Sequence, residues 1–70
     1  MTYTDEKGAV YGVGSGISDG EYWMTIRRKR GKKGSHRVVS PLLPLRATLV
    51  EAQADLDKWA AIKGLKPVRP

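Results

Sequence analysis

The strongest structural signal in the sequence is a capped amphipathic helix near its C-terminal end. Thr48 and Glu51 have capping-box spacing, in which each side chain can accept from a backbone N–H of the other residue. Gly64 can adopt the left-handed conformation that ends a helix, and Pro67 follows it. We therefore predict a helix over residues 49–63. One face of this helix, which is mainly apolar, follows helical spacing: Leu49, Ala52, Leu56, Trp59 and Ala60 or Lys63.

The residues before this helix predict the sheet that covers its apolar stripe. Residues 9–13, 21–28 and 36–40 are rich in strand formers and are separated by turn sequences, including Asp19-Gly20 and residues 31–35. The expected fold class is α+β, a three-stranded antiparallel sheet packed against one C-terminal helix. We expect residues 1–70 to form a single small domain, ordered over about 9–64, with flexible tails at 1–8 and 65–70.

Composition narrows the ways in which such a small domain can be stabilised. The 70 residues include no cysteine and one histidine, so we expect no disulfide, no zinc site and no cofactor. The N-terminus is polar and acidic, and no apolar run is long enough to cross a membrane. We therefore expect a cytoplasmic protein without a membrane partner.

Alternation of side chains divides the strand at 21–28 into two faces. The more apolar set, which we expect to pack against the helix, is Tyr22, Met24 and Ile26. The other set, which we expect on the outer face, is Trp23, Thr25 and Arg27.

Positive charge is concentrated immediately after this strand. The chain has a formal net charge of +6, and residues 27–37 contain seven Lys or Arg residues and no acid. A cluster of this kind indicates a polyanionic partner, with nucleic acid first, although such runs are usually only solvated. The expected nucleic-acid contacts are Trp23, Thr25, Arg27, Lys29, Arg30, Lys32, Lys33 and Arg37.

Two other functions are open. The chain can bind single-stranded RNA if Trp23 and either Tyr11 or Tyr22 stack on bases. Alternatively, it can dimerise or bind a host protein through the leucines of the Leu42–Leu45 segment. The structural interpretation of those leucines is that they cover the edge of the core.

We expect no enzymatic activity. His36 has no plausible nucleophile beside it in the sequence, and Asp55 and Asp57 lie two apart on a helix, so they do not face each other. The glycine-rich stretch at 12–16 lacks the lysine of a phosphate-binding loop and is not followed by a helix.

Several local strings resemble one known family. An aspartate-glycine turn leads into alternating apolar and basic residues at 19–27, a basic turn and strand follow at 31–39, and a Thr-capped helix begins at 48. This order resembles the N-terminal arm-site DNA-binding domains of tyrosine recombinases from phages and transposons, which are similar in fold to the plant ethylene-response-factor type of domain. The resemblance covers residues 10–64, but the Pro-Leu-Leu-Pro-Leu link at 41–45 is longer and more apolar than usual.

The resemblance implies duplex DNA binding by the sheet face, which enters the major groove in that family. Carried over by position, it implies DNA contacts from Trp23, Thr25, Arg27, Lys29 and Arg37. Lys32 and Lys33 would contact phosphates. A phage or other mobile element is then the expected source of the chain.

Overall fold

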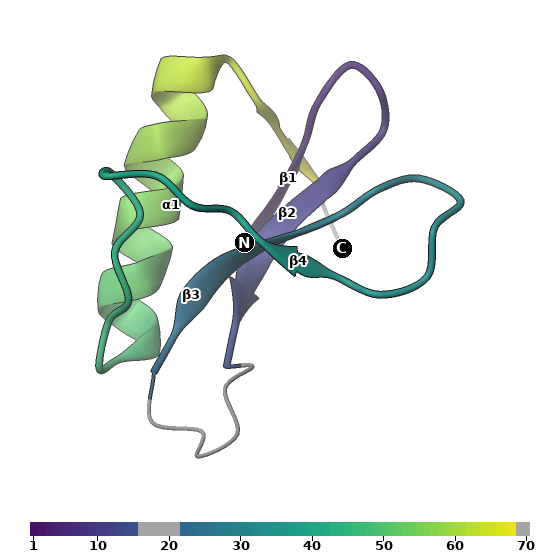
Figure 1. The fold of residues 1–70 in the computed structure, drawn as a ribbon. Coiled ribbons are helices and arrows are strands. Elements are labelled where there is room, and N and C mark those ends of the chain that lie inside the picture. Colours follow the sequence, from purple (N-terminus) through teal and green to yellow (C-terminus); the bar gives the residue numbers. More distant parts are fainter. Residues whose placement is uncertain (16–21, 69–70) are drawn as a thin grey trace.

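The computed structural model describes residues 1–15 and 22–68 as an α+β fold with one helix and one antiparallel sheet (Figure 1). The strands have the order β4-β3-β2-β1-β5. In chain order the elements are β1 (Thr2–Thr4), β2 (Val10–Gly14), β3 (Met24–Arg28), β4 (His36–Arg37), α1 (Leu49–Lys63) and β5 (Lys66–Val68). The predicted hairpin turn at Asp19-Gly20 lies outside the described residues.

The expected three-stranded sheet is wrong, because the sheet has five strands. The two additional strands, β1 and β5, lie in segments that we expected to be flexible tails. Asp5 explains β1: its Oδ1 accepts from the backbone N–H groups of Lys7 (2.9 Å) and Ala9 (3.0 Å), which closes a turn onto β2. Gly8 completes that turn with a φ of 84°. The chain then returns after α1 and adds β5 beside β1.

The predicted helix is confirmed over Leu49–Lys63. The Glu51 N–H donates to Thr48 Oγ1 at 3.2 Å, and the Thr48 hydroxyl donates to Glu51 Oε1 at 2.9 Å, in place of the expected return bond from the Thr48 N–H. Gly64 ends the helix with a φ of 72°. Ala52, Leu56, Trp59 and Ala60 are buried, whereas Leu49 is 46% exposed, so its expected place in the stripe is wrong.

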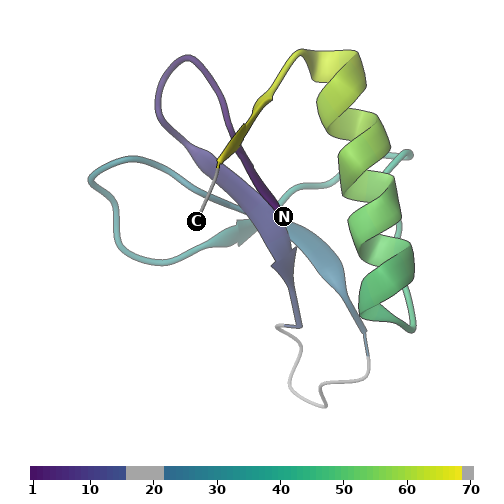
Figure 2. The ribbon, with the colours of Figure 1, turned by 180° about the vertical axis from the view of Figure 1, so that it is seen from behind.

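The helix lies on one face of the sheet, as the two opposite views show (Figures 1 and 2). The core between these layers contains Tyr3, Ala9, Tyr11, Leu43, Leu56, Trp59 and Ala60. The rings of Tyr11 and Trp59 are tilted by 52° with centroids 5.6 Å apart. The expectation that the leucines of the link cover the core holds for Leu43, which is 1% exposed, whereas its neighbour Leu42 is 51% exposed. None of the described helices is long and apolar enough to cross a membrane.

Candidate nucleic-acid interface

The register of the sheet decides which side chains share a face. Tyr3 pairs with Tyr11, Tyr11 with Arg27, and Arg27 with His36. Directly paired residues point to the same face. Because Tyr3 and Tyr11 belong to the core beneath the helix, Arg27 and His36 lie on the helix side of the sheet.

Our assignment of the two faces of β3 is therefore reversed. Thr25 pairs with Val13, which packs against the core, and Thr25 itself is 3% exposed. By alternation, Trp23 shares this side. Trp23 is half-buried, and its backbone exchanges hydrogen bonds of 2.7 and 2.9 Å with Arg46. Trp23, Thr25 and Arg27 thus do not lie on the face opposite the helix, where we expected them.

The face opposite the helix carries a different set of side chains, which we call the open face. Its members are Thr2, Thr4, Val10, Met24, Ile26, Arg28, Arg37, Lys66 and Val68, with Gly12 and Gly14 between them. Met24, at one end of this face, is buried and only 6% exposed, so it is not part of the accessible surface. A Cβ on Gly14 would lie 3.1 Å from Ile26 Cδ1, so this glycine lets Ile26 lie close against the strand. Of the predicted contacts in the strands, only Arg37 remains on this face.

The β3–β4 hairpin brings the remaining predicted contacts together at its tip. The Lys32 N–H donates to the Lys29 carbonyl at 3.1 Å, and Gly31 and Gly34 have φ values of 76° and 84°. Both features involve only the backbone, so the shape of the turn does not depend on the charged side chains of the hairpin. Lys29, Arg30, Lys32 and Lys33 are all exposed. The hairpin extends away from the helix in both opposite views (Figures 1 and 2).

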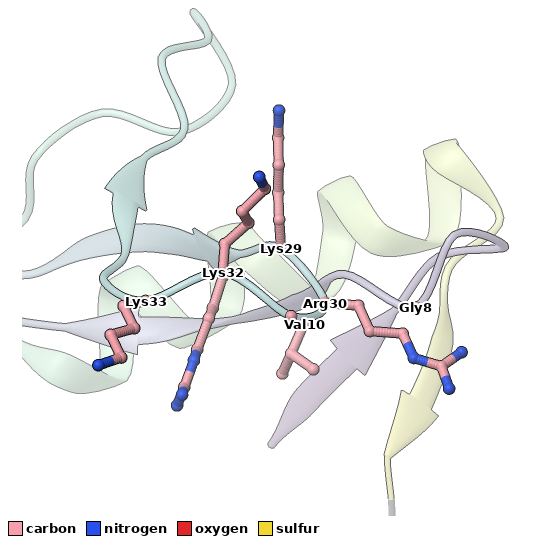
Figure 3. A pocket seen from close by; sticks show the side chains of 8 residues that line it. Gly8, Val10, Lys29, Arg30, Lys32 and Lys33 are labelled. Atoms are coloured by element: carbon pink, nitrogen blue, oxygen red, sulfur yellow. The ribbon is translucent and has the colours of Figure 1, made fainter.

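Three shallow hollows of about 440, 340 and 300 Å³ surround this hairpin, and none of the residues that line them is acidic. Figure 3 shows the largest, where Lys29 and Lys32 point to one side of the hairpin and Lys33 points to the other. Arg30 extends over Gly8 of the neighbouring turn, where a Cβ would lie 3.1 Å from Arg30 Cδ. Within the described residues, the ion pairs involve only Arg46, with Glu51 and Asp55, so no hairpin cation is neutralised there.

A polar cluster joins the hairpin to the core. The Tyr11 hydroxyl donates to Asp5 Oδ2 at 2.9 Å. Burial, together with this hydrogen bond, raises the pKa of Tyr11, and the nearby positively charged Arg27 partly opposes that rise. Desolvation alone would raise the pKa of Asp5, but hydrogen bonds from Ala9, Tyr11 and Lys7 outweigh it and hold that pKa below its ordinary value. Arg27 therefore lies close enough to Tyr11 for its charge to act on this cluster.

Two cations of this surface, Arg28 and Lys7, are not among the contacts expected from the sequence. Arg28 pairs with Val10 on the open face, and Lys7 lines the second hollow with Arg27 and Lys29. The signal for Lys7 was present in the Thr-Tyr-Thr strand formers and the glycine at 8, which together mark a first hairpin. Arg28 required the correct register, which no local pattern supplies.

The structure also changes which residues are available for the two alternative functions, RNA binding and protein binding. Tyr11 is 6% exposed, so it offers no free ring for base stacking, whereas Tyr22 is 41% exposed. Leu43 is buried, which leaves Leu42 as the exposed leucine of the expected protein-binding segment. No group of three or more potential metal ligands occurs among residues 1–15 and 22–68.

Comparison of the chain with protein-family models, with curated proteins and with solved structures finds no match in any of the three.

Proposed function

We propose that this chain is a non-enzymatic domain that binds duplex DNA through the β3–β4 hairpin and the adjoining open face. The observation that carries the proposal is the concentration of exposed cations on one projecting hairpin, with no described carboxylate paired to them. Phosphates are the complementary partner because each contact releases a counterion from the nucleic acid.

The open face adds a second chemical character to this surface. Arg28 and Arg37 flank Ile26, which is paired directly with Arg37. Guanidinium groups can form two hydrogen bonds to a phosphate or a guanine edge, and an aliphatic side chain can contact a thymine methyl group. The combination suits a duplex groove, where phosphates and base edges are presented together.

Duplex DNA is favoured over single-stranded RNA by the positions of the aromatic rings. Two of the three aromatic rings considered for base stacking do not lie on the open face, since Tyr11 is in the core and Trp23 lies on the helix side. The resemblance to recombinase arm-site domains supports the same choice and a mobile-element source. The proposed contacts within that surface now centre on Arg28 and Arg37 in place of Trp23, Thr25 and Arg27.

Fluorescence anisotropy with a labelled duplex tests this proposal. Arg28→Ala and Arg37→Ala are each expected to weaken binding about eightfold at 0.1 M salt, the loss of one phosphate contact. Lys58→Ala removes one exposed charge from the helix and is the matched control, with an expected change below twofold. Absence of binding at low salt, or equal losses in all three variants, would refute the proposal. Stronger displacement by single-stranded RNA than by duplex DNA would assign the surface to RNA.

A further inference from the structure

The β3–β4 hairpin has two cationic flanks, one on each side of the sheet. By register Arg27 and His36 lie on the helix side, and we assign Lys29 and Lys32, which point together to one side of the hairpin, to the same helix-side flank. The hollows span both flanks, because Lys29, Lys32 and Lys33 each line the first and the third. By register Arg28 and Arg37 lie on the open side, and Lys33, which points away from Lys29 and Lys32, completes the open-side flank. A surface that docked flat on DNA would need cations on the open side alone.

The helix-side flank is accessible because the helix does not cover the hairpin. The helix packs over the part of the sheet that carries Tyr3 and Tyr11, and the hairpin extends away from it (Figures 1 and 2). Lys29, Lys32 and His36 are exposed, and the first two point to the same side in Figure 3. The helix-side cations are therefore available to a ligand without any rearrangement of the core.

The hairpin is also the edge of the sheet. β4 is the outermost strand beyond β3, and it is formed by only His36 and Arg37. Among the described residues no further strand covers this edge. A ligand that approaches this edge can therefore contact β4 and both cationic flanks at the same time.

From these observations we infer that the hairpin enters the major groove of a duplex edge-on. In this arrangement Lys29 and Lys32 face the phosphates of one strand, and Arg28 and Lys33 face those of the other. The inference rests on the proposed DNA binding and adds its geometry. The major groove is about 12 Å wide and admits a two-stranded ribbon, whereas the minor groove is about 6 Å wide.

Two double variants separate the edge-on arrangement from flat docking. Lys29→Ala/Lys32→Ala removes two charges from the helix side, and Arg28→Ala/Lys33→Ala removes two from the open side. The turn bond between the Lys32 N–H and the Lys29 carbonyl uses backbone atoms, so neither variant removes it. Lys58→Ala/Lys63→Ala on the helix is the charge-matched control. Circular dichroism melts confirm that all four proteins are folded before they are compared.

The measurement is the slope of log affinity against log salt concentration for a labelled duplex. Each hairpin variant is expected to reduce the steepness of the slope by about 1.8, or 0.9 for each lost phosphate contact, while the control retains the wild-type slope. An unchanged slope for Lys29→Ala/Lys32→Ala, with a reduced slope for Arg28→Ala/Lys33→Ala, would overturn the edge-on arrangement and leave the proposed DNA binding intact. Absence of wild-type binding at low salt would instead overturn the proposed function itself.

A second duplex, whose cytosines carry bulky glucosylated 5-hydroxymethyl groups, tests the groove. These groups fill the major groove and leave the phosphates in place. We expect wild-type affinity to fall at least tenfold, because the hairpin can no longer enter. Equal affinity for the modified and unmodified duplexes would overturn the assignment to the major groove.

Discussion

Replacement of Leu43 by alanine tests how the leucine-rich link is packed. Leu43 is 1% exposed and belongs to the core cluster with Leu56 and Trp59, while Leu42 is 51% exposed. Hydrogen bonds to Ser40 fix this alternation: its carbonyl accepts from the Leu43 N–H at 3.0 Å, and its hydroxyl accepts from the Leu42 N–H at 3.2 Å. Both bonds use the backbone of the leucines, so they are retained in alanine variants.

The magnitude follows from the burial of the side chain. Removing a fully buried leucine side chain costs about 2–5 kcal/mol, and the link can relax at the edge of the core, so we expect about 2–3 kcal/mol. A domain of this length has a total stability of about 3.5–10 kcal/mol. Leu43→Ala should therefore remove a large part of it and lower the melting temperature by about 8–24 °C. Leu42→Ala, the matched control, should cost about 1 kcal/mol or less.

Urea unfolding followed by far-ultraviolet circular dichroism measures both free energies, provided that the two variants retain the same dependence on urea. Equal losses of stability in Leu42→Ala and Leu43→Ala would refute the packing of the link. A Leu42→Ala variant that loses more than Leu43→Ala would mean that the two leucines exchange their roles.

Three further predictions concern the turn, the helix end and the polar residue on β3. The pKa of Asp5 is lowered in the folded state, so its contribution to stability is present above its ordinary pKa near 4 and is lost as the pH falls through the folded value. Asp5→Asn should therefore flatten the dependence of melting temperature on pH between about 5 and 2. A wild-type melting temperature that does not change over this range would contradict the prediction. Gly64→Ala should cost about 1–2 kcal/mol in urea unfolding, because its φ is 72° and no atom within 4 Å would obstruct the added Cβ, and a cost near zero would contradict the left-handed helix end. Thr25→Lys places a charge at a position that is 3% exposed on the helix side, so the variant should be unfolded, as measured by circular dichroism. A stably folded variant would support the assignment of Thr25 to the outer face that the sequence predicted.

The helix could be predicted from the sequence because its signals are local. Thr48, Glu51 and Gly64 mark its ends within a few residues of chain, and Leu56 and Trp59 repeat at helical spacing. The sheet depends on contacts between distant residues. β5 is three exposed residues that include Pro67, and it forms only because the chain after α1 returns to pair with β1. No local pattern predicts such a pairing.

The faces of β3 were predicted wrongly for a related reason. The apolar residues Met24 and Ile26 suggested a core face. Met24 is buried as that suggested, but it lies outside the core cluster, in which Tyr3 and Tyr11 supply the aromatic surface beneath the helix. The β2–β3 register then places Thr25 and Arg27 on the same side as those tyrosines. A one-residue change of register would exchange the faces, which is why composition alone could not decide between them. The charge of the hairpin does not depend on register, so its tip could be identified from the sequence.

The most direct test of the proposed DNA binding is the salt dependence of wild-type affinity for a duplex, measured by fluorescence anisotropy between 50 and 200 mM salt. If four to seven phosphates are contacted, the slope of log affinity against log salt should be about −4 to −6. A slope shallower than about −1, or no binding at 50 mM, would contradict the claim that the hairpin cations bind a nucleic-acid backbone.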